Sequence, residues 1–218
     1  KEKFISLFRA SLGGILAGIS LGHGVSFFMP FSLALLWSIS TMPFCAFVWG
    51  GAAGLLTHQW LLALHPLDWV GISFPFSLLI AIAIWLFSGF LAGALVFCWS
   101  FLLFKFNRSF CRERISKVKI LHVFFFSAIW GLGEVLLAQW PLFWIGIGTG
   151  LLPGDRWLAG LARWFGAGGL AVIQLLIGWW VWQLAFNCEN INKFKKIFLY
   201  GFICLIAGHS IGWNLLKS

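Results

Sequence analysis

The chain consists of long apolar stretches with almost no charged residues, separated by short polar or basic segments. Only 10% of its 218 residues are charged and 61% are hydrophobic, whereas an ordinary soluble domain carries about 25% charged residues. An α-helix needs about 20 apolar residues to cross the hydrocarbon core of a bilayer. The sequence therefore predicts an all-α integral membrane protein. We expect one transmembrane domain over residues 1–218, with no soluble domain in this chain.

About seven transmembrane helices are expected from the apolar stretches and the Pro, Gly and basic residues between them. The predicted spans are 4–21, 31–42, 44–64, 76–104, 120–139, 158–186 and 197–216. The first, third and fourth of them carry glycines four residues apart, a spacing that lets membrane helices approach closely. These glycine pairs are Gly14 and Gly18, Gly50 and Gly54, and Gly89 and Gly93.

The charge distribution predicts how the spans are oriented. The net charge is +9, and most basic residues fall in three short segments, 1–9, 105–119 and 193–196. Membrane proteins keep such short basic segments in the cytoplasm, so we expect a cytoplasmic N-terminus and a C-terminus outside. Because this pattern explains the charge and no nucleic-acid module is visible, no nucleic-acid partner is expected.

Glu134 lies within the fifth predicted span, where an ionised carboxylate is costly unless it has a partner, a proton or a cavity. Arg163, one span later, is a candidate partner. A structural ion pair, or a protonated and hydrogen-bonded Glu134, is one interpretation, and a role in lining a substrate path is the other. If Glu134 is protonated and structural, replacing it with Gln would have a mild effect.

The segment from Gln139 to Asp155 is unusual for a loop because it is rich in Trp, Pro and Gly rather than polar residues. Tryptophan is enriched where membrane and water meet. We therefore expect Trp140 and Trp144 to lie at the membrane interface or to contact a lipid.

No metal site is predicted, because the five histidines lack paired i, i+4 spacing and the five cysteines lack CxxC spacing. The 15 Trp and 25 Phe either fill the core and the interfacial belts or contact a lipid or a pigment. In the second case a histidine could be the axial ligand of a chlorophyll or a haem, and His58 and His209 are the best placed.

Three segments resemble the membrane domain of apolipoprotein N-acyltransferases, especially members of cyanobacterial type. They read MPFSLALLW at 29–37, FVWGGAAGLLTHQWLLALHPLDW at 47–69, and a third segment at 129–182 that begins IWGLGEVLLAQWPLFW. The resemblance covers residues 10–215. Departures include Leu137, where the family often has Arg, and Pro141-Leu142-Phe143-Trp144 in place of the usual Gly-Phe-Pro-Trp.

The resemblance implies a two-part enzyme. Its membrane domain would hold phospholipid and lipoprotein. A nitrilase-like outer domain with a Glu-Lys-Cys set would carry an acyl chain on the Cys and deliver it to the N-terminal amine of the lipoprotein. An eighth span would close the chain. None of the five cysteines here matches the nucleophile, so no catalytic residue is expected within 1–218, and the sequence leaves open whether the protein is an enzyme.

On this interpretation the substrate-side candidates are Glu134, Trp140, Trp144 and Arg163, and no cofactor is needed. The expected location is the bacterial plasma (inner) membrane, or the thylakoid in a cyanobacterium. The alternative is a non-enzymatic subunit or scaffold of a larger, photosynthetic pigment–protein complex. It would bind other membrane subunits, with chlorophyll or carotenoid as cofactor. A small-solute transporter is less favoured, because it would need more polar spans and usually an internal repeat.

Overall fold

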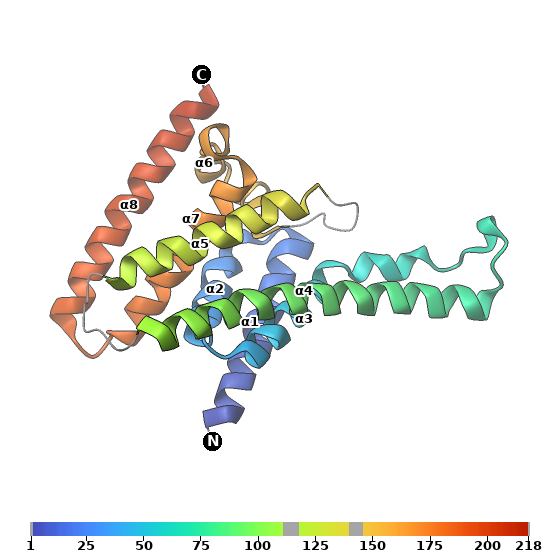
Figure 1. The fold of residues 1–218 in the computed structure, drawn as a ribbon. Coiled ribbons are helices and arrows are strands. Elements are labelled where there is room, and N and C mark those ends of the chain that lie inside the picture. Colours follow the sequence, from blue (N-terminus) through green and yellow to red (C-terminus); the bar gives the residue numbers. More distant parts are fainter. Residues whose placement is uncertain (1, 111–117, 140–145, 218) are drawn as a thin grey trace.

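The computed structural model describes residues 2–110, 118–139 and 146–217, and these residues form helices and turns with no strand (Figure 1). The all-α prediction is confirmed. The α-helices are α1 (Glu2–His23), α2 (Met29–Ser38), α3 (Pro43–Thr57), α4 (Phe74–Phe110), α5 (Val118–Leu137), α6 (Arg156–Ala159), α7 (Ala162–Phe186) and α8 (Ile191–Lys217). Short 3-10 helices are η1 (Ser26–Phe28), η2 (Gln59–Leu64), η3 (Asp68–Val70) and η4 (Ile147–Leu151).

Five described helices are long and apolar enough to cross a membrane, namely α1, α4, α5, α7 and α8. The predicted spans 31–42 and 44–64 instead hold the shorter apolar helices α2 and α3. At 1.5 Å per residue these two are about 15 and 22 Å long, less than the hydrocarbon core of about 30 Å. The orientation and the number of seven spans remain predictions.

The centre of the molecule is built from α1, α2 and α3, and α3 also packs along α4. The glycine pairs allow this packing. A Cβ added at Gly14 would lie 2.4 Å from the Trp49 carbonyl oxygen, and one at Gly54 would lie 2.6 Å from the Ala92 Cβ. The close approach predicted from the glycine spacing is therefore present.

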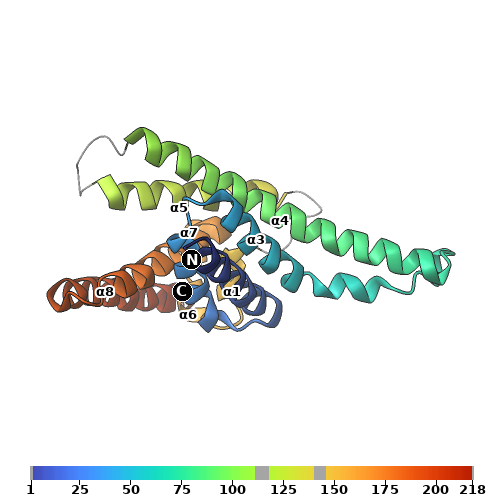
Figure 2. The same cartoon turned by 90° about the horizontal axis from the view of Figure 1, so that it is seen from below.

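Helix α4 is the longest element and extends beyond the rest of the molecule (Figures 1 and 2). Its 37 residues correspond to about 55 Å of helix. The projecting half runs beside η2 and η3, and large apolar side chains are exposed there, including Trp69 of η3 and Phe74 and Phe76 of α4. We infer that this half lies against lipid.

Helices α5 and α7 pack closely where two glycines face each other. A Cβ on Gly131 would lie 2.5 Å from the Gly168 carbonyl oxygen, and one on Gly168 would lie 2.7 Å from the Gly131 carbonyl oxygen. The predicted span 158–186 is not one continuous helix. It is divided into α6 and α7, and α7 is interrupted at Gly166, whose φ of 62° is readily adopted only by glycine.

Tryptophan indoles link the helices. In five cases among the described residues, an indole N–H donates to a backbone carbonyl of a different helix. The pairs are Trp37 with Leu175 (2.9 Å), Trp49 with Ser32 (3.3 Å), Trp85 with Leu55 (2.8 Å), Trp99 with Phe126 (2.9 Å) and Trp180 with Ile197 (2.9 Å). Each ring thus buries apolar area while its polar atom finds a partner.

Candidate functional site

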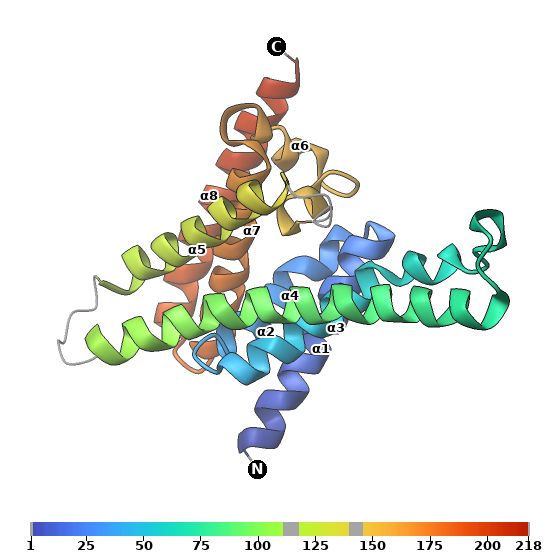
Figure 3. The ribbon, with the colours of Figure 1, turned by 45° about the vertical axis from the view of Figure 1, so that its right-hand side comes forward.

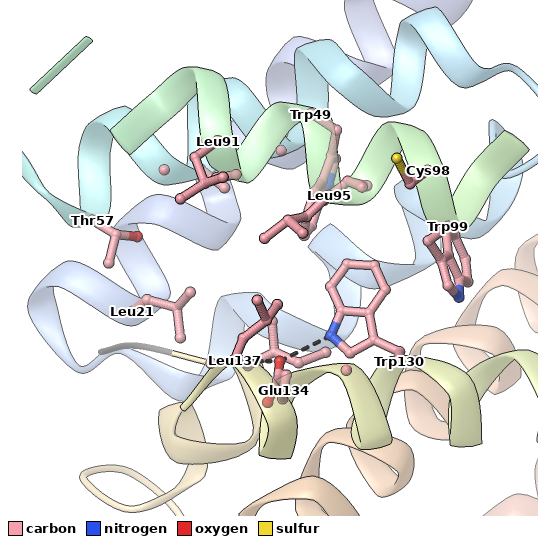
Figure 4. Close-up of a pocket in the computed structure, with 18 of the residues that line it drawn as sticks. Leu21, Trp49, Thr57, Leu91, Leu95, Cys98, Trp99, Trp130, Glu134 and Leu137 are labelled. Carbon is pink, nitrogen blue, oxygen red and sulfur yellow. Dashed lines mark hydrogen bonds between the residues drawn. The ribbon is translucent and has the colours of Figure 1, made fainter. Parts of the chain in front are cut away.

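An apolar cavity of about 290 Å³ lies among α3, α4 and α5, with Leu21 of α1 and residues 146–147 completing its wall (Figure 4). It exists because α4 packs extensively on α3 but has few contacts with α5, so that α4 and α5 diverge (Figure 3). Leucines of α4 form one side, at positions 91, 95 and 102, and Leu137 of α5 lies across from them.

Three tryptophans form the aromatic part of the wall. The Trp99 and Trp130 rings meet edge to face with centroids 5.2 Å apart, and Trp49 and Trp130 do so at 6.4 Å. The Trp99 indole is fixed by its bond to the Phe126 carbonyl across the α4–α5 gap. This wall is therefore rigid and apolar.

The carboxylate of Glu134 lines the cavity, although the residue is only 7% exposed. Oε1 accepts from the Trp130 indole (2.9 Å) and from the backbone N–H of Ile147 (2.7 Å), and Oε2 accepts from the backbone N–H of Gly148 (3.2 Å). A carboxylate with several N–H donors can remain buried without a counter-ion. Glu134 thus ties α5 to the first two residues of η4.

Glycines make this contact possible. A Cβ on Gly146 would lie 2.3 Å from Glu134 Oε2, and a Cβ on Gly148 would lie 2.1 Å from the Ala167 carbonyl oxygen. From the other side the Gln174 amide of α7 donates to the Ile147 carbonyl. The segment is therefore held between α5 and α7.

The predicted ion pair between Glu134 and Arg163 is absent among the described residues. Arg163 instead donates to the Leu215 carbonyl oxygen, 2.9 Å away, and so joins α7 to α8. The reason is local, because backbone N–H groups already surround the Glu134 carboxylate. Trp140 and Trp144, the other two substrate-side candidates, lie outside the described residues.

The two histidines proposed as pigment ligands have different surroundings. His58 lines the cavity, and its Nδ1 is 2.9 Å from the Gly54 carbonyl oxygen. His209 is outside the cavity, with Nδ1 2.7 Å from the Leu205 carbonyl oxygen and Nε2 2.9 Å from Asp155 Oδ2. Both ring nitrogens of His209 are thus engaged, and neither is offered to a pigment.

The described residues contain no group of three or more His, Cys, Asp or Glu side chains that could hold a metal ion. The leucines and tryptophans of its wall give the cavity a shape and a lining that suit an apolar ligand. The sequence did not identify the residues that form the cavity wall, among them Thr57, Trp99, Trp130 and Gly133. One signal was available: Trp130 lies four residues before Glu134, on the same helix face.

Comparison with known proteins finds relatives whose similarity extends over the whole of this chain. The chain is 49% identical over 217 residues to an apolipoprotein N-acyltransferase of Prochlorococcus marinus strain MIT 9313, covering 100% of this chain and 44% of the relative. It is 45% identical to the apolipoprotein N-acyltransferase of a second Prochlorococcus marinus strain, with the same coverage. A relative in Gloeobacter violaceus is 27% identical over 94% of this chain and 40% of its own length.

No family model and no solved structure matches the chain. The chain spans less than half the length of the curated relatives it matches. Those relatives bear the family name that segments 29–37, 47–69 and 129–182 suggested, at identities that extend well beyond these segments. Over the stretch that it spans, the chain is therefore homologous to the corresponding part of these apolipoprotein N-acyltransferases.

Proposed function

We propose that this chain is the membrane part of an enzyme that transfers an acyl chain from phospholipid to the N-terminal cysteine amine of lipoproteins. In this proposal the cavity among α3, α4 and α5 holds an acyl chain of a lipid substrate. The reaction itself is carried out by residues outside this chain. The carrying observation is the apolar cavity, in a chain that is 49% identical to an apolipoprotein N-acyltransferase over 217 residues.

The size and lining of the cavity support an acyl chain. Its volume of about 290 Å³ is at the lower end of the roughly 300–1,000 Å³ of ligand sites, which suits one slender chain better than a chlorophyll ring system. Leucines and tryptophans dominate its wall, and the Glu134 carboxylate is already engaged by three N–H donors.

In this proposal Glu134 shapes the site instead of reacting. Its bonds to Ile147 and Gly148 hold the wall between α5 and η4. Arg163, which joins α7 to α8, is not among the residues that line the cavity. We further propose the plasma membrane as the location, with lipoproteins presented at its outer face.

The test uses the complete gene product that contains this chain, in lipid nanodiscs with phospholipid and a diacylglyceryl-cysteine peptide. Gly133 lines the cavity, and a Cβ there would meet nothing within 4 Å, so the side chain of Gly133→Leu can occupy cavity space from an unobstructed Cβ position. We expect the mass-detected acylation rate to fall about tenfold or more, which corresponds to at least about 1.4 kcal/mol.

The matched control is Ala128→Leu, at an exposed position of the same helix. It should leave the rate within about twofold, because it adds a side chain only to the outer face of α5. Equal rates for the two variants, or no acyl transfer by the unmodified protein, would refute the proposed function.

A further inference from the structure

Three buried hydroxyl groups have no hydrogen-bond partner among the described residues, namely those of Ser20, Thr57 and Ser127. Such groups are rare in folded proteins, because burying a hydroxyl without a partner is costly. Of the three, Thr57 alone belongs to the wall of the cavity. It is only 4% exposed, and its oxygen is directed toward the cavity (Figure 4).

Other polar groups of the wall are already engaged. Ser88 Oγ donates to the Trp85 carbonyl oxygen at 2.7 Å, and the Glu134 carboxylate accepts three N–H groups. No Lys or Arg is among the described lining residues. The cavity therefore offers a bound molecule a neutral hydrogen-bond donor in Thr57 and no ammonium or guanidinium group to bind an anion.

Thr57 lies at one end of an apolar path. Helices α3 and α4 are antiparallel, with Gly54 beside Ser88 and Gly50 beside Val96. From the level of Ser88 the wall continues along α4 to Leu102, about 21 Å at 1.5 Å per residue. One leaflet contributes about half of the 30 Å hydrocarbon core, so the path is long enough for one membrane acyl chain.

We propose that the Thr57 hydroxyl donates a hydrogen bond to the ester carbonyl oxygen of a phospholipid acyl chain, whose methylene groups run along α4 toward Trp99 and Leu102. The identity of the ligand rests on the proposed function. An ester carbonyl fits because it is a neutral acceptor at the head of an apolar tail. The hydroxyl is thus a positioning group that fixes which carbon of the chain lies against each residue of the wall.

The test measures directly which carbon of the acyl chain lies against which residue of the wall. The complete gene product in nanodiscs receives phosphatidylcholine bearing a photoreactive diazirine either at carbon 3 of one acyl chain or next to its terminal methyl group. After irradiation, crosslinked peptides are identified by mass spectrometry. We expect the carbon-3 probe to label α3 near Thr57 and α4 near Leu91, and the terminal probe to label residues around Trp99 and Leu102.

Two substitutions isolate the hydroxyl. Thr57→Val keeps the shape of the side chain and removes the donor, and should lower the carbon-3 yield near Thr57 by about three- to tenfold, the worth of one hydrogen bond. Thr57→Ser should restore it. Ser127→Ala, which removes an equally orphaned hydroxyl outside the cavity, should leave the map unchanged.

Misfolding can be separated from lost binding. Without lipid probe, Thr57→Val should be at least as heat-stable as the unmodified protein, because it removes an unpartnered polar group. An unchanged labelling map in Thr57→Val, or labelling positions that are reversed between the two probes, would refute the proposed hydrogen bond from Thr57. If the labelling map is as expected but acyl transfer is absent, only the proposed function is refuted. If acyl transfer is intact but labelling does not depend on the position of the diazirine, only the Thr57 hydrogen bond is refuted.

Discussion

The His209 ring and the Asp155 carboxylate join α8 to the turn before α6, with Nε2 and Oδ2 2.9 Å apart. Between side chains of residues 2–110, 118–139 and 146–217 it is the one contact with ion-pair geometry, and it is an ion pair when the His209 ring is protonated. The other oxygen of Asp155 accepts from the Leu158 N–H at 3.1 Å and caps α6. A single carboxylate thus caps α6 and also joins α6 to α8.

Substitutions at Asp155 should separate these two roles. Asn retains a capping oxygen but weakens the contact with His209, so Asp155→Asn should lower the free energy of unfolding by less than about 1 kcal/mol. Asp155→Ala loses both contacts and should cost about 1–2 kcal/mol. Thermal unfolding in detergent, followed by circular dichroism, measures the difference. Identical losses would mean that the cap contributes nothing.

Glu134→Gln should be clearly destabilising, contrary to the mild effect expected for a protonated residue. Two N–H donors reach Oε1 and a third reaches Oε2, and an amide NH₂ at the second position cannot accept. Leaving one buried N–H unpaired should cost about 1–3 kcal/mol. Chemical denaturation in nanodiscs measures it, with the exposed Glu189→Gln as control. A stability loss no larger than that of the control would exclude this role.

The glycines of α5 should differ sharply in their tolerance of alanine. Gly131→Ala forces a Cβ to within 2.5 Å of the Gly168 carbonyl oxygen and should cost about 1–3 kcal/mol by pushing α5 from α7. Gly133→Ala, two residues along, meets nothing within 4 Å and should gain up to about 1 kcal/mol of helix propensity. Melting temperatures of the two variants provide the comparison, and the reverse order would contradict the α5–α7 contact.

Trp99→Phe should lower the free energy of unfolding by about 1 kcal/mol, because it removes the indole N–H that bonds to the Phe126 carbonyl. Trp69→Phe, at a residue that is 79% exposed, is the matched control and should be nearly neutral. The two are compared by thermal unfolding under the same conditions. If both variants melt alike, the bond across the α4–α5 gap does not stabilise the fold.

The sequence predicted best those features that depend on local composition. The fifth span, 120–139, is close to α5 at Val118–Leu137, because apolar length marks a membrane helix directly. The glycine pairs likewise predicted close helix contacts. The interruption at Gly166 could not be foreseen, since a glycine within an apolar run looks the same whether its φ is negative or positive.

The site was only partly predictable. Glu134 was identified from the cost of a carboxylate at membrane depth, but Arg163 was the wrong partner. The true partners include the backbone N–H groups of Ile147 and Gly148, and a backbone donor leaves no trace in residue type. Thr57 was overlooked because only the divergence of α4 from α5 makes its surroundings a cavity.

The tryptophans that donate across helices also make this protein easy to observe. Each such indole N–H can exchange with deuterium only when its own pair of helices separates. In a protein with nitrogen-15 in its tryptophans, the signal of Trp37 would follow the α2–α7 crossing, and that of Trp180 would follow the α7–α8 crossing. The order in which these signals fade would therefore give the order in which the helices come apart in a bilayer.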